Sequence, residues 1–281
     1  MNDPAPWTCP TCQVSVTTSF CARCGEEPLA PRDLTLRGLA EKLLHALTSI
    51  DARVLRTMWQ LVRHPGDLTA SWAQGARKPW VAPFQLFLIA NVIFFALQSL
   101  TGIHIFSSPL QSHLHHQDWS ELARSLLDAR LRVTHDRLEH YAPLFDRAVV
   151  LNAKTLIVLM TIPFAAMLPL MFLRERRPFM LHVVFSLHLY TFLLLLFCVA
   201  LVVATLSAWP GSGGLDSPVV DDVLTVMNLV VCGLYLHAAI GRVHGSRGAA
   251  RVLQAVVSTL AVGVIVVGYR FVLFLITLYG T

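Results

Sequence analysis

The sequence predicts an all-α polytopic membrane protein with about five transmembrane helices and a small zinc ribbon near its N-terminus. Two observations carry this prediction. Of the 281 residues, 55% are hydrophobic and 14% are charged, whereas an ordinary soluble protein has about 25% charged residues. Two Cys-x-x-Cys pairs, Cys9/Cys12 and Cys21/Cys24, precede the apolar segments. A composition this apolar indicates that a lipid bilayer surrounds most of the chain.

The four cysteines in residues 1–31 have the spacing of a metal site. Each Cys-x-x-Cys pair can present two thiolates, and four thiolates complete a tetrahedral Zn²⁺ site that leaves no open position for catalysis. The spacer of eight residues between the pairs fits a minimal ribbon. A redox dithiol would accompany a βαβ pattern, which the sequence lacks. We therefore predict a structural zinc ion bound by Cys9, Cys12, Cys21 and Cys24.

Residues 32–82 predict an amphipathic helical linker at the inner face of the membrane. From Leu36 to Val62, apolar residues recur three and four positions apart, with arginines and a lysine between them, as in an amphipathic helix. Such a helix either lies on the lipid leaflet or packs on its own protein, and the sequence leaves both alternatives open. Basic groups next to tryptophan are typical of a membrane interface. The predicted interface residues are Arg77, Lys78 and Trp80.

Residues 83–281 contain five apolar segments that reach or approach the roughly 18 residues of a transmembrane helix. The predicted spans are about 83–100, 149–173, 179–209, 219–240 and 252–279. Between the first two spans, residues 102–147 form an external insertion, in which residues 119–147 are predicted to be one charged amphipathic helix. The third and fifth segments exceed the thickness of the bilayer, so we expect tilt or water-exposed ends.

The distribution of arginine predicts how the spans are oriented. Basic residues link spans two and three at 174–177 and spans four and five at 242–251, whereas the link at 209–218 contains no lysine or arginine. Cytoplasmic connections carry the excess of basic residues. We therefore expect the N-terminus in the cytoplasm, and residues 102–147 and the C-terminus outside.

The first hundred residues combine several short motifs. The double Cys-x-x-Cys is followed by a Pro-Gly pair, a Gly-x-Arg, an aromatic residue and a proline that opens the first span; the matching residues are Pro65, Gly66, Gly75, Arg77, Trp80, Pro83 and Phe87. This pattern resembles an uncharacterised bacterial family of zinc-ribbon integral membrane proteins. The resemblance implies a bacterial inner (plasma) membrane location and brings no established activity. One departure is Gln13, because such knuckles commonly have glycine after the second cysteine.

Charged and polar residues inside the spans predict an outward-facing polar pocket. A charge at the centre of a transmembrane helix costs about 2.5–3.5 kcal/mol, so such residues usually face a partner or water. We expect Asp222 to pair with Arg270 or Lys154; alternatively, Lys154 and the aspartates extend to the lipid headgroups. The candidate pocket residues are Asn91, Gln98, Lys154, His188, Asp221, Asp222 and Arg270.

The twelve histidines of the chain form no recognised catalytic pattern. The tract from His113 to His116 resembles a weak external metal patch, and His182 and His188, six residues apart, lie on different helix faces. The sequence has no HExxH, Gly-x-Ser-x-Gly or phosphate-binding glycine loop. Its basic residues lie beside the spans, so we expect no nucleic-acid partner.

These observations predict a scaffold or transport-type membrane module more than an enzyme. In this hypothesis the ribbon recruits a protein partner or stabilises a homo-oligomer, while the spans contain the polar pocket. Two alternatives stay open, namely an intramembrane histidine-dependent enzyme and an oligomeric pore.

Overall fold

The structure is a computed structural model that describes residues 6–9, 13–18, 20–23, 52–76, 79–103, 105–115, 117, 119–173, 177–207 and 218–281; side chains at the start of α9 are described from Leu224 on. The chain forms two compact units, Met1–Arg53 and Val54–Thr281. Each unit is described by itself below.

The N-terminal unit contains a small β-hairpin. Strand β1 (Trp7–Thr8) pairs antiparallel with β2 (Ser15–Val16), which places Trp7 opposite Val16. These two residues cluster with the buried cysteines Cys9 and Cys21. In the connecting turn, Gln13 has a φ of 61°, a left-handed conformation that glycine adopts most easily. Gln13 therefore occupies a backbone conformation that favours glycine.

The second unit is a multi-pass membrane bundle, because five of its helical segments are long and apolar enough to span a bilayer. These segments are α3 (Pro83–Thr101); α6 (Leu138–Leu156) continued by η2 (Ile157–Met160) and α7 (Thr161–Met171); α8 (Phe179–Ser207); α9 (Pro218–His244); and α10 (Gly248–Gly280). Large apolar side chains such as Val92, Leu170 and Val264 are more than 65% exposed on the outside of the bundle. Such a surface indicates contact with lipid.

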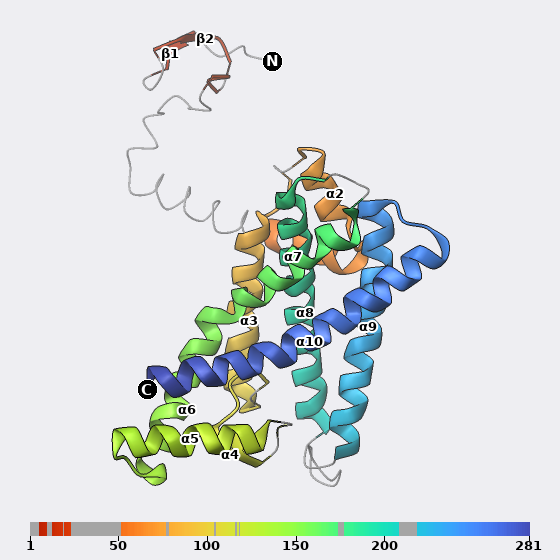
Figure 1. Ribbon diagram of the computed structural model, residues 1–281. Coiled ribbons are helices and arrows are strands. Elements are labelled where there is room, and N and C mark those ends of the chain that lie inside the picture. Colours follow the sequence, from red (N-terminus) through yellow and green to blue (C-terminus); the bar gives the residue numbers. More distant parts are fainter. Residues whose placement is uncertain are drawn as a thin grey trace. The chain divides into compact units, whose positions relative to one another are not determined.

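Successive spans run in alternating directions, which gives the bundle two distinct ends (Figure 1). The short helix α2 (Asp67–Ala73) lies at one end, beside the C-terminus of α9. The helices α4 (Leu110–His115) and α5 (Ser120–Thr134) lie at the other. We call these the α2 end and the α4–α5 end. Helix α8 packs against α3 and α7, while α10 packs against α9 and α6.

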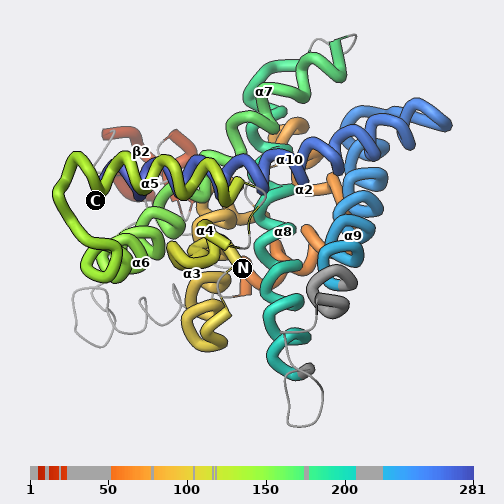
Figure 2. The backbone as a smooth tube through the Cα atoms, turned by 60° about the horizontal axis from the view of Figure 1, so that its bottom comes forward, coloured from red at the N-terminus to blue at the C-terminus, as the bar shows by residue number. Residues whose placement is uncertain are grey.

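The last helix is the longest and lies obliquely across its neighbours. Its 33 residues give a length of about 50 Å, well beyond the roughly 30 Å of a hydrocarbon core. In both views α10 crosses α8 at a large angle (Figures 1 and 2). Its C-terminus is tied to α6, because the Tyr141 hydroxyl donates a hydrogen bond to the Leu278 carbonyl at 2.9 Å.

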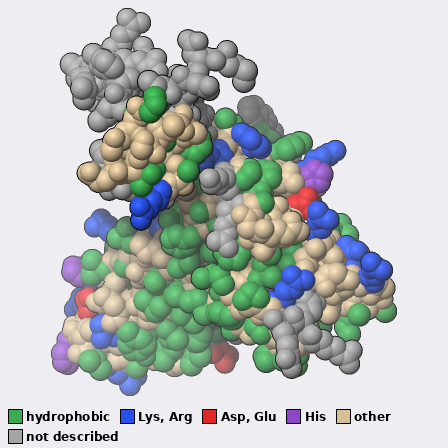
Figure 3. Space-filling model, turned by 90° about the horizontal axis from the view of Figure 1, so that it is seen from above, with side chains coloured by type: hydrophobic (Ala, Val, Ile, Leu, Met, Phe, Trp, Pro, Cys, Tyr) green, Lys and Arg blue, Asp and Glu red, His purple; other side chains and the backbone are tan. Residues whose placement is uncertain are grey.

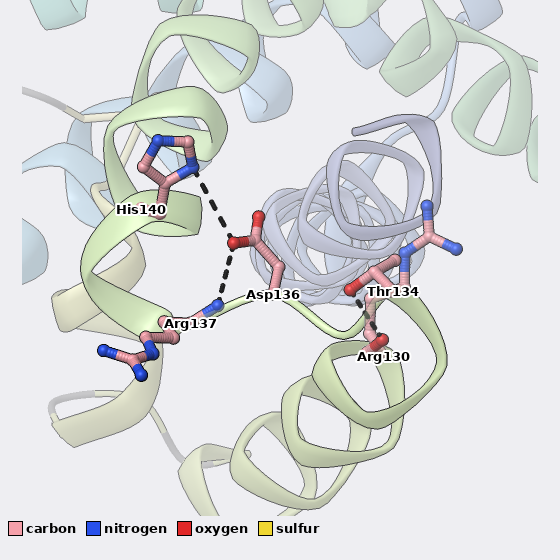
Figure 4. A network of polar contacts seen from close by, with 5 residues as sticks. All are labelled: Arg130, Thr134, Asp136, Arg137 and His140. Carbon is pink, nitrogen blue, oxygen red and sulfur yellow. Dashed lines mark hydrogen bonds and ion pairs between the residues drawn. The ribbon is translucent and has the colours of Figure 1, made fainter.

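The insertion contains a helix break that the sequence pattern did not predict. The predicted single helix over residues 119–147 is two helices, because α5 ends at Thr134 and His135 has a φ of 56°. The Asp136 carboxylate then accepts a hydrogen bond from the Arg137 backbone N–H at 2.8 Å and lies 3.7 Å from the His140 ring (Figure 4). An aspartate that bonds nearby backbone favours a turn over a continuous helix. Helix α6 therefore begins at Leu138, before the predicted start of the second span near residue 149.

The linker before the first span packs on the bundle through one face and exposes the other. Residues 52–63 are helical, and on this helix Thr57 and Leu61 are buried, at 0% and 2% exposure. The Thr57 hydroxyl also accepts a hydrogen bond from the Val81 backbone N–H at 3.2 Å. Leu55 and Trp59 on the opposite face are 68% and 66% exposed. The helix thus combines packing on its own protein with a second, exposed apolar stripe.

The Pro-Gly turn after this helix contacts α9 closely. Gly66 has a φ of 87°, and a Cβ atom added there would lie 2.9 Å from the Ala239 carbonyl oxygen. The next residue, Asp67, accepts hydrogen bonds from Arg242 Nε at 2.5 Å and from Gln60 Nε2 at 3.2 Å. The turn therefore holds α2 and the helix before it, from Val54 on, against the end of α9, and only glycine fits at its contact point.

Candidate functional site

A pocket of about 510 Å³ lies between α8, α9, α10 and the connection that follows α3. This volume is within the range of about 300–1,000 Å³ that is usual for ligand sites. Most of its lining is apolar, as at Phe106, Leu193 and Val262, and its polar residues include Thr225 and Asn228. Arg270 also lines it, and among the lining residues that the structure describes no other is charged. It is the strongest candidate for a functional site in the described part of the chain.

Arg270 is held at this pocket by the connection between α3 and α4. Its Nη2 atom donates a hydrogen bond to the hydroxyl of Ser108 at 3.1 Å, and Ser108 is 3% exposed. A guanidinium inside a span is stable only next to polar partners or water. The pocket therefore contains a positively charged side chain next to the connection between α3 and α4.

Gln98 supports the same connection from α3. Its side-chain N–H donates to the Ser107 hydroxyl at 2.8 Å, and its oxygen accepts from the Ile105 backbone N–H at 3.2 Å. Gln98 is 3% exposed. It satisfies polar groups that a non-helical segment would otherwise leave unpaired in an apolar environment. Gln98 thus shapes one wall of the pocket without lining it.

The structure places the other predicted pocket residues elsewhere. The Asn91 side chain donates to the Lys154 backbone carbonyl at 3.1 Å, joining α3 to α6, and the Lys154 side chain is exposed. His188 lies nearer the α2 end, where its Nδ1 is 2.8 Å from the Thr69 hydroxyl. Asp221 lies in the first turn of α9. The side chains of Asp221 and Asp222 are outside the described residues, so their pairing with Arg270 stays a prediction.

Of the three predicted interface residues, only Trp80 is described; Arg77 and Lys78 are outside the described residues. Trp80 lies beside α2 and lines a small cavity of about 120 Å³ together with Leu68, Trp72 and His188. The tryptophan therefore contributes to the packing of the linker on the bundle.

Two of the four predicted zinc ligands lie within the described residues. Cys9 and Cys21 are 0% and 1% exposed and belong to one small cluster, while Cys12 and Cys24 are outside the described residues. Two buried thiols in one cluster fit half of a Cys₄ donor set. Within the described ranges alone, no group of three or more His, Cys, Asp or Glu residues could hold a metal ion.

The external histidine tract separates into two different environments. His115 is exposed, His116 is outside the described residues, and His113 is 2% exposed. The His113 ring packs among aromatic rings, with centroid distances of 5.0 Å to Phe274 and 6.1 Å to Phe145. Burial, and secondarily the charge of Arg270, lowers its pKa from 6.5 to about 4. His113 is therefore a neutral packing residue, and it shares no metal-binding surface with His115.

This burial predicts a specific loss of stability in acid. The unfolded chain protonates His113 below pH 6.5, while the folded protein keeps it neutral down to about pH 4. Its neutral form therefore stabilises the fold fully above pH 6.5, and the stabilisation is lost as the pH falls, by about 1–2 kcal/mol at pH 5. We expect the thermal midpoint of the wild type to fall more between pH 7 and pH 5 than that of His113→Phe. Equal slopes for the two proteins would contradict this assignment.

Several residues of these sites were not singled out in the sequence. Ser108, Thr225 and Asn228 are ordinary polar residues, and only Asn228, in the middle of a span, gave a signal that could have been used. Its Oδ1 is buried and has no hydrogen-bond partner in the described part of the protein.

Nearer the α2 end, the His244 ring stacks on Phe172 at a centroid distance of 3.6 Å and lies 5.8 Å from the His182 ring.

Comparisons with known proteins give one limited match. No curated protein and no solved structure matches the chain. One family model matches residues 51–95. This segment comprises the helix at 52–63, the turn at Gly66, α2 and the first part of α3. It therefore covers the linker that packs on α9 and includes none of the residues that line the pocket at Arg270. The family whose model matches these residues is described as a protein of unknown function, DUF3667.

Proposed function

We propose that this protein is a scaffold or transport-type membrane module that binds a ligand in the pocket at Arg270. The observation that carries the proposal is the pocket of about 510 Å³ inside the bundle, which has a charged residue in its otherwise mostly apolar lining. Maintaining an arginine within a span is costly, and intramembrane ionisable residues commonly mark binding or transport sites. A pocket without a catalytic constellation in its described lining favours binding over chemistry.

The proposed location is a bacterial inner membrane with the α2 end in the cytoplasm. Arg63, Arg242 and Arg247 are exposed at this end, and Figure 3, which views the molecule from this side, shows basic side chains on its surface. Excess arginine and lysine beside the spans is typical of the cytoplasmic side. In this orientation α4, α5 and the C-terminus lie outside, and the pocket opens toward the outer leaflet.

The proposed role of the N-terminal unit is to recruit a cytoplasmic protein or to stabilise a homo-oligomer. The support is its separation as a compact unit of its own and the burial of Cys9 and Cys21. Zinc bound by these residues together with Cys12 and Cys24 would hold the hairpin together, since four thiolates complete a structural site.

Filling the pocket with a larger side chain tests the proposed function. Gly263 on α10 lines the pocket, and a Cβ added there meets Leu229 at 3.9 Å, an ordinary contact. Gly268 on the same helix is exposed, and a Cβ added there meets nothing within 4 Å. We expect native mass spectrometry to detect a co-purified small molecule in the wild type and in Gly268→Phe. The molecule should be lost in Gly263→Phe.

The two variants introduce the same residue into the same helix, so Gly268→Phe controls for effects on folding and for effects of the detergent. Equal retention of the molecule by both variants would overturn the proposed pocket. So would a wild-type protein that retains no molecule.

A further inference from the structure

The helix over residues 52–63 has two apolar sides that face in different directions. One side contains Thr57 and Leu61, which are buried, and Leu61 belongs to the core of the bundle. The other side contains Leu55, Trp59 and Val62, which are 68%, 66% and 48% exposed. These three residues are four and three positions apart, so they form one continuous stripe along the helix. We call Leu55, Trp59 and Val62 the apolar stripe.

A basic side borders the apolar stripe. Arg56 and Arg63 are both exposed and are seven residues apart, which places them on one side of the helix, about 90° from the stripe. The guanidinium carbon of Arg63 lies 5.9 Å from the centre of the Trp59 ring. An exposed apolar stripe with tryptophan and flanking arginines is typical of a helix that lies in the interface of a membrane.

The position of this helix matches the boundary of the hydrocarbon. Near its start, the Thr57 hydroxyl accepts a hydrogen bond from the Val81 backbone N–H at 3.2 Å, two residues before α3 begins. After its end, the turn at Gly66 approaches Ala239 in the last part of α9. Phe84, in the first turn of α3, is 53% exposed. The helix thus connects the start of one span to the end of another, at the level where lipid-facing side chains begin.

The size of the apolar stripe favours lipid over a protein partner. A stable protein interface buries roughly 800 Å² on each partner, which is far more than three side chains on one helix present. An interfacial helix requires only an apolar face that enters the boundary between headgroups and acyl chains by about 5–10 Å. The stripe and its basic border fit that boundary, because acyl chains lie next to negatively charged phosphates there.

We propose that the helix over residues 52–63 lies in the lipid interface at the α2 end, with the apolar stripe among the upper acyl chains and Arg56 and Arg63 at the headgroup phosphates. The buried side of the helix meanwhile stays packed on the bundle through Thr57 and Leu61. The helix would then fix the depth of the α2 end in the bilayer. This surface is separate from the pocket at Arg270, so the inference does not depend on the proposed function.

The test compares two neighbouring positions, Leu55→Cys in the apolar stripe and Arg56→Cys on the basic side. Each variant is placed, one copy per disc, in nanodiscs of equal parts phosphatidylglycerol and phosphatidylcholine. Mass spectrometry of the peptide that contains the new cysteine measures its rate of reaction with a water-soluble maleimide. We expect Leu55→Cys to react about tenfold more slowly than Arg56→Cys, because only the thiolate reacts and an apolar environment raises the pKa of a thiol.

Val92→Cys is the control for a position covered by lipid. Val92 lies in the middle of the span α3 and is 70% exposed, so its replacement should react at least as slowly as Leu55→Cys. Leu55, Arg56 and Val92 are all exposed side chains, so these replacements remove no buried contact. Equal maleimide rates at Leu55→Cys and Arg56→Cys would show that the stripe faces water and would overturn the proposal.

A second measurement distinguishes lipid from protein as the cover of the stripe. A nitroxide attached to Leu55→Cys should be reached by oxygen, which concentrates in lipid, and not by a water-soluble nickel chelate; wild-type protein treated in the same way gives the signal of the native cysteines. Exclusion of both reagents would show that protein covers the stripe, and this result would reject the lipid interface. Protection that appears only in discs with two copies would assign the stripe to a second copy of the chain and would reject it equally.

Discussion

Replacing Gly66 with alanine is expected to destabilise the membrane unit by about 2–5 kcal/mol. A left-handed alanine costs about 1–2 kcal/mol, and forcing a methyl group into a packed contact costs a further 1–3 kcal/mol or so. The contact is severe here, because the added Cβ would lie 2.9 Å from the Ala239 carbonyl oxygen and 3.0 Å from the Ala239 Cα. Both neighbouring atoms belong to the backbone of α9, so they cannot move aside as a side chain could.

Gly75→Ala is the matched control for this prediction. Gly75 has a φ of 84°, close to the 87° of Gly66, but an added Cβ there meets nothing within 4 Å. It should therefore lose only the conformational part, about 1–2 kcal/mol. Thermal unfolding of both variants in the same detergent measures the difference. Equal destabilisation would show that the contact with Ala239 contributes nothing.

The neighbouring ion pair is expected to have a smaller effect than the glycine contact. Arg242 and Asp67 are joined at 2.5 Å, but the Arg242 side chain is 62% exposed. Exposed ion pairs contribute about 0–1 kcal/mol. Removing the charge pair is therefore expected to cost less than the steric clash introduced by Gly66→Ala.

The second large effect is expected on removing the proposed zinc ion. Wild-type protein purified without chelator should contain one zinc per chain, and Cys9→Ser or Cys21→Ser should lose it and unfold the N-terminal unit. Structural zinc in small domains contributes on the order of 10–16 kcal/mol of apparent binding free energy, more than a hairpin with two-residue strands can replace. Metal analysis and limited proteolysis measure the two losses. The membrane unit should keep its thermal midpoint, because it is a separate compact unit.

Cys198→Ala provides the control for the zinc prediction. Cys198 lies within α8 in the membrane unit, so its replacement should leave both the zinc content and the proteolysis pattern of the N-terminus unchanged. Protein that contains no zinc and whose four N-terminal thiols all react with a maleimide would reject the metal site. Any partner of the ribbon should be lost from Cys21→Ser and retained by Cys198→Ala.

Much of the fold was predictable because the length and the hydropathy of each apolar segment are local properties of the sequence. Each span is a predominantly apolar segment, so the five candidate spans followed from the local hydropathy of the sequence. The start of α6 at Leu138 was not predictable in the same way. The break before it depends on a left-handed His135 and on one aspartate that bonds the Arg137 backbone, whereas the helical periodicity of residues 119–147 continues across it.

The candidate site was predicted only in part. Arg270 was singled out in the sequence because a charge in a span is rare and costly, and the structure places it on a pocket wall. His188 and Lys154 gave a similar signal but lie elsewhere: His188 contacts Thr69 on α2, and the Lys154 side chain is exposed. Their depth along each helix could be read from the sequence. The direction in which each side chain points could not.

The sequence by itself determined that this chain crosses a membrane, how many times it can do so, and which residues carry a charge inside the spans. These properties follow from the free energy of transferring each segment into lipid, which is a sum over local residues. Only the tertiary structure decided that the Gly66 turn packs on α9, that His113 is buried among aromatic rings, and that Arg270 lines a pocket with Asn228. Those contacts join residues far apart in the chain, so they depend on the rotation and packing of whole helices.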